Sequence, residues 1–340
     1  MAQASITGIV SASKYRAYLL LQQDPYNLKG GWEGFLFFPA RIKTWLFKMI
    51  RFIRRYFPLL VLFFILVGCR TPARDKRPGV DPNLHLYLLA GQSNMAGRGP
   101  LVTTTKIVDP RVLMLDKSNR WVVASDPLHF DKPAVVGVGP GFTFGQGMAA
   151  TSPKRIRIGL IPCAVGGSSI EAWQKGGYDQ ATKTHPYDDA LARVRVAQQS
   201  GVIKGIIWHQ GESDSSPEKA GTYLSKLINL VAAFRQDLGN EHLPFVAGEL
   251  GYYKEAYRQF NQGLVLLPRQ AAHTALVTAE GLNHKGDETH FDTASAQELG
   301  RRYAAAMNKL SAKPKQLPSP FFKIKLPLLG VYKAKDIAQQ

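Results

Sequence analysis

Short runs of apolar residues alternate with longer amphipathic segments through the middle of the chain. The runs are predicted strands, at 85–89, 156–162, 203–208, 245–250 and 275–278. The segments between them repeat apolar positions every three to four residues and are predicted helices, at 142–150, 187–199, 217–238, 252–270 and 293–310. Strands that alternate with helices imply a central parallel sheet covered on both faces. The pattern therefore predicts an α/β fold with three layers, α/β/α.

The two ends of the chain depart from this pattern. An apolar run, 57–67, follows a basic patch that begins near Met49, and a small residue, Gly68, precedes Cys69. A basic region, a short apolar run and a small residue are typical of a secretory signal, and the run is short for a membrane span. We therefore expect the chain to start at Met49. The predicted parts are an extension (1–48), a signal (49–69), a linker (70–83), one folded domain (84–312) and a basic tail rich in Pro and Lys (313–340).

The residues Leu66-Val67-Gly68-Cys69 resemble the lipobox of bacterial lipoproteins, in which the cysteine is lipidated and becomes the mature N-terminus. This resemblance implies a lipid anchor on Cys69 and a membrane as partner. It also implies a position in the bacterial cell envelope, outside the cytoplasm, at the outer membrane or its periplasmic face. The alternative is a hydrophobic anchor that stays uncleaved in the membrane.

The strongly basic composition does not indicate nucleic-acid binding. The formal net charge is +18, but the first 69 residues hold nine Lys and Arg against two Asp and Glu, and residues 313–340 hold six against one. The 243 residues between them carry only about +6, which is ordinary for a globular domain, and they contain no recognisable RNA- or DNA-binding motif. The basic ends are therefore interpreted as membrane-facing or solvated segments, and we expect no nucleic-acid partner.

Polar or glycine-rich residues directly follow three of the predicted strands. The first strand leads into Gly91-Gln92-Ser93-Asn94-Met95, the second into the glycine turn 166–169, and the third into the polar segment 209–214. In parallel sheets the site lies beyond the carboxyl ends of the strands, so these three segments are expected to meet. A serine at such a place is a candidate nucleophile, and a glycine turn offers backbone N–H groups to an oxyanion. Taken singly, each segment also fits a helix cap or an ordinary turn.

A fourth segment supplies an acid and a base. Asp287 and His290 are three residues apart, just before the last predicted helix. At this spacing the Asp287 carboxylate can accept a hydrogen bond from Nδ1 of His290, which leaves Nε2 free. An imidazole held in this tautomer can take the proton of Ser93 during attack and return it to the departing alcohol.

The four segments together resemble the sialate O-acetylesterase and acetyl xylan esterase branch of the SGNH (GDSL-type) hydrolases. The resemblance extends from about 85 to 307 and rests on GQSNM, the GG turn, WHQGESD and the DxxHFD pattern. It implies a flavodoxin-like three-layer fold around a parallel sheet, with 84–312 as the esterase domain. It also implies a serine esterase, without cofactor or metal, that removes acetyl groups from carbohydrate such as xylan or from sialic acid.

The resemblance also assigns roles by position. Ser93 is the expected nucleophile, and Asp287 and His290 complete the triad. The oxyanion hole is expected from the N–H groups of Ser93 and Gly167 and from the Gln210 side chain. One departure matters: other SGNH enzymes carry an Asn in the third segment, where this chain has His-Gln-Gly-Glu.

Two side chains keep alternative interpretations. Glu212 can orient the site or take the place of Asp287 as the acid that supports His290. Arg98 can contact a substrate carboxylate or hydroxyl, or form a structural ion pair.

Two other functions compete with the esterase. The first is a non-catalytic surface protein that binds carbohydrate on the same fold. The second is a metal-dependent hydrolase that uses His209, His284 and His290, but these residues lack a recognisable ligand spacing such as His-x-x-x-His. We therefore expect no metal.

Overall fold

The computed structural model describes residues 79–101 and 109–312. Within these residues, seven strands form one sheet in the order β3-β2-β4-β1-β5-β6-β7. Neighbouring strands run parallel, except that β2 and β3 form an antiparallel pair at one edge. The strands are β1 (Leu84–Gly91), β2 (Val112–Leu115), β3 (Trp121–Val123), β4 (Arg157–Pro162), β5 (Val202–His209), β6 (Phe245–Gly248) and β7 (Thr274–Val277). The predicted fold class, a three-layer α/β fold with a central parallel sheet, is confirmed, and the antiparallel pair of β2 and β3 at the edge is a departure from it.

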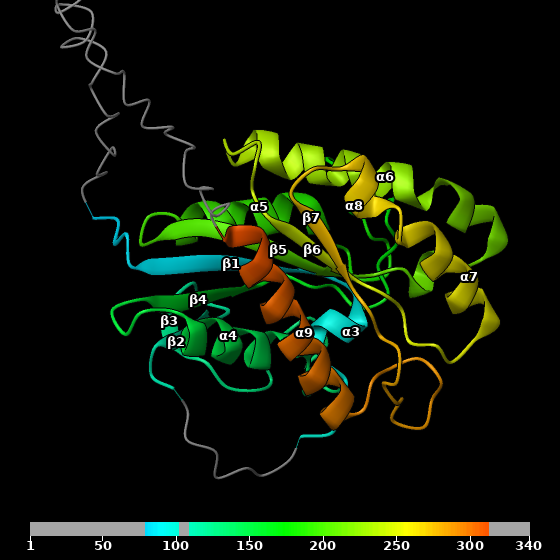
Figure 1. Ribbon diagram of the computed structural model, residues 1–340, viewed down its shortest axis with the longest axis horizontal. Coiled ribbons are helices and arrows are strands. Elements are labelled where there is room, and N and C mark those ends of the chain that lie inside the picture. Colours follow the sequence, from blue (N-terminus) through cyan, green and yellow to red (C-terminus); the bar gives the residue numbers. More distant parts are fainter. Residues whose placement is uncertain (1–78, 102–108, 313–340) are drawn as a thin grey trace, which may run out of the picture. The chain divides into compact units, whose positions relative to one another are not determined.

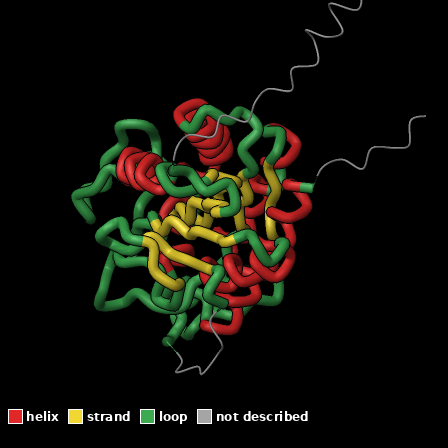
Figure 2. The backbone as a smooth tube through the Cα atoms, turned by 90° about the vertical axis from the view of Figure 1, so that its left-hand side faces the viewer, coloured by secondary structure: helices red, strands yellow, loops and turns green. Residues whose placement is uncertain are grey.

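Helices cover both faces of the sheet. Figure 1 shows α4 and α9 on one side and α5, α6 and α8 on the other, and Figure 2 shows the strands enclosed between helices. The helices are α3 (Ser93–Ala96), α4 (Pro140–Thr151), α5 (Pro186–Ala197), the 3-10 turn η2 (Glu212–Asp214), α6 (Pro217–Asp237), α7 (Glu255–Leu264), α8 (Leu267–Gln270) and α9 (Thr293–Ser311). Because β4 and β5 flank β1 and are reached through helices on opposite faces, the edge beyond the end of β1 is where a site is expected.

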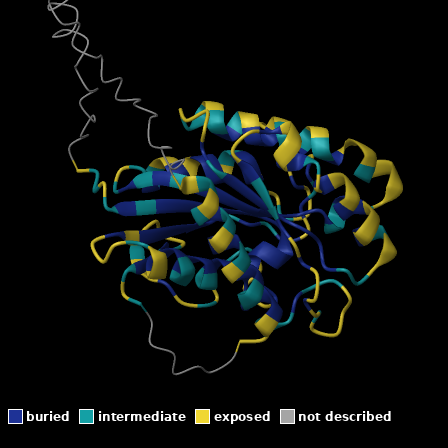
Figure 3. Ribbon diagram, viewed as in Figure 1, coloured by how far each residue is buried: buried dark blue, intermediate teal, exposed yellow. Residues whose placement is uncertain are grey.

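The strand β1 shows why the sheet is buried on both faces. Its alternate side chains enter two separate hydrophobic clusters, with Leu86 and Leu88 in the one that contains α5 and α6, and Tyr87 and Leu89 in the one that contains α4 and α9. Both faces are thus apolar, as expected of a parallel sheet. Figure 3 shows the strands buried and the exposed positions concentrated on the outer faces of the helices.

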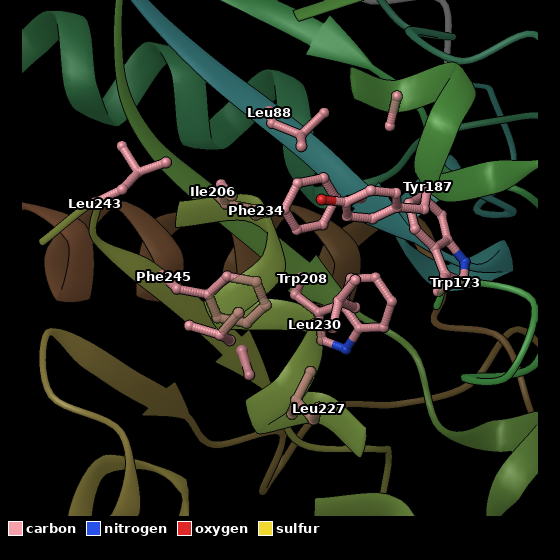
Figure 4. Packing of buried hydrophobic residues seen from close by; sticks show 14 of the residues in the cluster. Leu88, Trp173, Tyr187, Ile206, Trp208, Leu227, Leu230, Phe234, Leu243 and Phe245 are labelled. Carbon is pink, nitrogen blue, oxygen red and sulfur yellow. The ribbon is translucent and has the colours of Figure 1, made fainter. Parts of the chain in front are cut away.

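Aromatic side chains fill the cluster on the α5 and α6 side (Figure 4). Trp173 meets Trp208 edge to face with ring centroids 5.1 Å apart, and Tyr187 lies 4.6 Å from Phe234. Trp208 is the residue before the last residue of β5, so this packing fixes the end of the strand that leads into the polar segment 209–214. Burial of such large rings dominates the energetics of a core.

Several helix ends follow the local sequence. The helix α5 begins with Pro186 and carries Asp188 and Asp189 in its first turn, a composition that suits the positive end of a helix dipole. The helix α9 is capped by Asp292, whose side chain accepts a hydrogen bond from the Ser295 N–H at 2.8 Å. This cap, two residues after His290, fixes where the helix starts.

Two features differ from the sequence-based prediction. The strands β2 and β3, which form the antiparallel pair at the edge of the sheet, were not predicted. The single helix predicted at 252–270 is wrong, since it is divided into α7 and α8. Pro268 lies in the first turn of α8, where its missing N–H costs nothing, and it could not have continued α7.

The predicted extension, signal and tail lie outside the described residues, as does most of the linker. The last linker residues, 79–83, are described. Within them, Asp81 pairs with Arg157 at 2.9 Å, and its N–H donates to the Ser200 carbonyl. The described part of the linker is therefore joined to the domain.

Candidate active site

Ser93 lies where β1 turns into the short helix α3. Gly91 has φ 131°, and a Cβ atom there would lie 2.0 Å from the His209 carbonyl oxygen, so only glycine allows β1 and β5 to approach this closely. The Gln92 N–H donates to the same carbonyl at 2.8 Å. Ser93 is then the first residue of a helix whose four residues are all buried. The turn holds the predicted nucleophile on the most central strand of the sheet.

The structure brings Ser93, His290 and Asp287 together. The Ser93 Oγ lies 2.9 Å from His290 Nε2, and His290 Nδ1 lies 2.7 Å from Asp287 Oδ2. The second oxygen, Oδ1, accepts the backbone N–H groups of Thr289 at 3.0 Å and His290 at 2.8 Å. Glu288 has φ 52°, a left-handed conformation that lets the carboxylate reach both N–H groups and the ring. The arrangement is that of a nucleophile, a base and an orienting acid.

The environment sets the charge of the acid and the base. Burial is the largest influence on His290 and lowers its pKa below the usual 6.5, although the hydrogen bond and charge of Asp287 oppose this. Burial of Asp287 disfavours its charged form, but the hydrogen bonds from His290 and Thr289 outweigh burial and lower the pKa of Asp287 to about 2. At neutral pH the pair is therefore a neutral imidazole beside a carboxylate, which is the form that can accept a proton from Ser93.

Hydrogen bonds from other side chains hold the glycine turn 166–169, which follows β4. The Gly166 N–H donates to Asp131 Oδ2 at 2.8 Å, and Gly167 has φ 85°. The Ser168 hydroxyl donates to the Val165 carbonyl at 2.7 Å and accepts from the Trp173 indole at 2.8 Å. The N–H groups of Ser93 and Gly167 have no acceptor among the described residues. Two of the predicted oxyanion donors thus remain available.

The third predicted donor, Gln210, is contradicted by the geometry. Its side chain is fully buried, and its amide nitrogen lies 2.6 Å from Asp214 Oδ2, 3.1 Å from Gln92 Oε1 and 3.1 Å from the Ser168 carbonyl. All of these acceptors belong to the protein, and the buried Asp214 carboxylate is the strongest of them. Gln210 therefore ties together the segments that carry the site and does not present a donor to substrate.

Arg98 forms the structural ion pair, which was one of its two interpretations. Its guanidinium lies 2.7 Å from Asp131 Oδ2 and also donates to the Gly97 carbonyl at 2.8 Å, and both side chains of the pair are about 5% exposed. Burial disfavours ionisation of Asp131, but Arg98 outweighs it and lowers the pKa of the carboxyl. Asp131 was not among the predicted site residues, because it lies 35 residues before Gly166 in a loop without a pattern.

Glu212 is not the acid that holds His290. Its Oε1 accepts a hydrogen bond from the Asn94 side chain, whereas Asp287 occupies the imidazole Nδ1. Asn94 itself was missed as a functional residue, although it follows Ser93 directly. Its amide nitrogen donates to the Thr289 carbonyl at 2.9 Å, and its oxygen accepts the Phe291 N–H at 3.0 Å.

The three histidines of the metal alternative do not converge. His209 is fully buried against Tyr303, and His284 Nδ1 accepts the N–H groups of Gly286 and Glu288. Over residues 79–101 and 109–312, no three His, Cys, Asp or Glu side chains are grouped as metal ligands. None of the helices described here is long and apolar enough to cross a membrane.

Comparisons with known proteins identify the family of this chain. A family model described as carbohydrate esterase, sialic acid-specific acetylesterase matches residues 83–309. The probable carbohydrate esterase At4g34215 of Arabidopsis thaliana is 32% identical over 264 residues, which cover 70% of this chain and 96% of that protein. The X-ray structure of the Arabidopsis protein has a TM-score of 0.60 at 29% identity, with 67% of this chain and 99% of that chain covered.

Two more distant structures share the fold. NanS has a TM-score of 0.53 at 19% identity, with 68% of this chain and 98% of that chain covered. XAC1771, a carbohydrate acetylesterase from Xanthomonas citri, has a TM-score of 0.52 at 18% identity, with 66% and 56% covered.

Proposed function

The chain belongs to the family of carbohydrate esterases and sialic acid-specific acetylesterases, and on this premise we propose that it removes O-acetyl groups from carbohydrate with Ser93 as nucleophile. The observation that carries the proposal is the 2.9 Å contact between Ser93 Oγ and His290 Nε2, with Nδ1 held by Asp287. Acetylated polysaccharide such as xylan and acetylated sialic acid are the two substrate classes proposed.

The first half of the reaction forms an acetyl-enzyme. As the Ser93 oxygen attacks the acetyl carbonyl carbon, its proton moves to His290 Nε2, and the carbonyl oxygen becomes an oxyanion. The N–H groups of Ser93 and Gly167 stabilise this oxyanion. The imidazolium then gives its proton to the sugar oxygen, the bond between that oxygen and the acetyl carbon breaks, and the sugar leaves.

The second half restores the enzyme. A water molecule loses a proton to His290 and attacks the acetyl-serine, and the tetrahedral intermediate releases acetate as the proton returns to Ser93 Oγ. Asp287 stays ionised throughout and stabilises the imidazolium, which agrees with its low pKa.

Acetate release from acetylated xylan, acetylated sialic acid and a short aryl acetate tests the proposal. Wild-type protein is expected to release acetate from at least one carbohydrate, and Ser93→Ala to release none above background while still binding that carbohydrate. Binding of the carbohydrates without any hydrolysis by the wild type would indicate the non-catalytic carbohydrate-binding alternative. Full activity of Ser93→Ala would refute the serine mechanism.

We also propose that Cys69 carries a lipid anchor that keeps the enzyme in the bacterial cell envelope. The support is the sequence of 49–69, which lies outside the described residues. Expressed in a bacterium, the protein is expected to incorporate labelled fatty acid and to enter the detergent phase, whereas Cys69→Ala should lose the label. Equal labelling of the mutant would contradict lipidation of this cysteine.

A further inference from the structure

Asn94 joins the nucleophile helix α3 to the segment that carries His290. Its side-chain nitrogen donates to the Thr289 carbonyl at 2.9 Å, and its side-chain oxygen accepts the Phe291 N–H at 3.0 Å. These are the residues directly before and after His290. Because Asn94 is adjacent to Ser93 in the chain and 3% exposed, it connects the backbone beside the nucleophile to the backbone on both sides of the base.

Glu212 determines how Asn94 is oriented. Its Oε1 accepts from the same Asn94 nitrogen, so the amide has one acceptor on each of its two N–H hydrogens. The Glu212 side chain is 5% exposed and comes from η2, the turn that follows β5. A contact from a different strand end therefore fixes the rotation of the Asn94 amide, and with it the position of the His290 segment.

The protonation of Glu212 follows from its neighbour His209. Tyr303 donates its hydroxyl hydrogen to the Trp208 carbonyl at 2.7 Å, so its oxygen is left as an acceptor for His209 Nδ1, at 3.1 Å. The hydrogen of a neutral imidazole is then on Nδ1 and the lone pair on Nε2. This Nε2 lies 3.8 Å from Glu212 Oε1, inside the protein.

If Glu212 were ionised, its carboxylate and the lone pair of His209 Nε2 would face each other as two hydrogen-bond acceptors. Neither His209 Nε2 nor Glu212 Oε2 has a hydrogen-bond partner among the described residues, although both atoms are buried. A buried carboxylate oxygen without a donor, such as Oε2, is costly, whereas a protonated carboxyl carries a hydrogen on that oxygen and no charge. The contacts therefore favour a neutral acid at this position.

The other groups around Glu212 provide no compensating positive charge. Asp214, on the same turn, is a second carboxylate, and the remaining titratable groups that interact with Glu212 are the phenols of Tyr223, Tyr253, Tyr257 and Tyr303. Burial is the main influence and raises the pKa of Glu212 to about 7, while the Asn94 side chain and the backbone N–H groups of Glu212 and Gly211 oppose the rise. Burial likewise lowers the pKa of His209 to about 3, so its ring stays neutral.

We propose that Glu212 is a neutral carboxylic acid that positions His290 through Asn94. This inference rests on the proposed role of His290 as the base. Glu212 and Asn94 are thus positioning residues, and Asp287 is the carboxylate that balances the imidazolium. Glu212 contributes the geometry of a hydrogen bond and no charge to the reaction.

The test is the contrast between two substitutions of Glu212. Gln preserves the acceptor for Asn94 and offers an N–H to His209, so Glu212→Gln is expected to keep kcat within about threefold of the wild type. Glu212→Ala and Asn94→Ala remove the link and are expected to lower kcat by about 100-fold with KM little changed, because small misplacements of a reacting group have effects of this size. Glu249→Ala is the matched control, since it deletes another buried carboxylate, one that accepts from Tyr252 and the Ala279 N–H. Its kcat should be unchanged.

Two outcomes would overturn the proposal. If Glu212→Gln loses as much kcat as Glu212→Ala, the negative charge is what matters and the acid is not neutral. If Glu212→Ala keeps wild-type kcat, the link does not position the base.

A spectroscopic measurement separates this proposal from the proposed function. The low-field Nδ1 proton signal of His290, assigned with His290→Gln, is expected to persist in Glu212→Gln and to disappear in Glu212→Ala. The infrared difference between wild type and Glu212→Gln at pH 6 should contain the carbonyl stretch of a protonated carboxylic acid, and its absence would overturn the neutral acid. Neither signal needs turnover, so both remain informative if Ser93→Ala shows that the serine mechanism is wrong.

Discussion

The carboxylate of Asp131 holds the backbone N–H of Gly166 at 2.8 Å, and the same oxygen is paired with Arg98. One buried ion pair thereby holds the glycine turn that carries Gly167, one of the two proposed oxyanion donors. A Cβ atom on Gly166 would lie 2.4 Å from the Arg98 guanidinium and 2.7 Å from Asp131, so this contact also requires glycine. Contacts within the protein therefore hold the turn in place, and preorganised donors are what oxyanion stabilisation requires.

Removal of the Asp131 side chain is expected to destabilise the folded protein. Asp131→Ala leaves the Arg98 charge buried without a partner and should lower the free energy of unfolding by about 3–5 kcal/mol, measured by urea denaturation. The more exposed pair of Arg111 and Asp109 provides the control, and Asp109→Ala should cost less than about 1 kcal/mol. Equal losses in the two variants would mean that the Arg98 pair is not effectively buried.

The three triad residues should behave as one unit. Ser93→Ala, His290→Ala and the double variant are each expected to lower kcat by about 10⁴-fold or more, without additivity, because each one removes the same step. Asp287→Asn should approach this loss. Ser225→Ala, an exposed serine on α6, is the control and should have no effect. A double variant much slower than either single variant would argue that the two residues act separately.

The acid limb of the pH profile should report His290. The pKa of His290 lies below 6.5, so kcat/KM is expected to stay high as the pH is lowered to 6.5. At lower pH kcat/KM should decrease, because the imidazolium cannot accept the Ser93 proton. Lys285 lowers the pKa of His290, and Lys285→Gln should therefore move the limb to higher pH, by less than about one unit. Lys309→Gln, in the last turn of α9, should leave it in place. A shift to lower pH in Lys285→Gln would contradict this electrostatic assignment.

Stability should depend on pH through Glu212. Its pKa is about 7 in the folded protein and near 4.5 when solvated, so the folded state holds the proton more tightly between these values. Stability attributable to this group then falls as pH rises from about 4.5 to 7. Relative to the wild type, Glu212→Gln should gain up to about 3 kcal/mol at pH 8 and little at pH 4.5, by urea denaturation. A gain that does not depend on pH would rule out titration of Glu212 as its cause.

Patterns among residues close in the sequence determine most of the secondary structure and part of the site. The five parallel strands β1, β4, β5, β6 and β7 and the main helices follow from runs and periods of apolar residues, because each such pattern involves only residues close in the sequence. The pair of Asp287 and His290 is also local, since three residues of chain bring the two side chains within hydrogen-bonding distance. The placement of Ser93 and of the glycine turn at one sheet edge followed from the rule that parallel strands end together.

Tertiary structure alone decided which polar groups pair over long distances. Gln210 carries the right chemistry for an oxyanion donor, yet its amide donates to Asp214, four residues along the chain, and to Gln92 and Ser168, which only packing brings beside it. Arg98 had two equally reasonable partners until the fold placed Asp131 beside it, and Glu212 was directed to Asn94 and away from His290 in the same way. A buried polar group must find a partner inside the protein, and the nearest one depends on how separate strand ends are packed together, which no local pattern encodes.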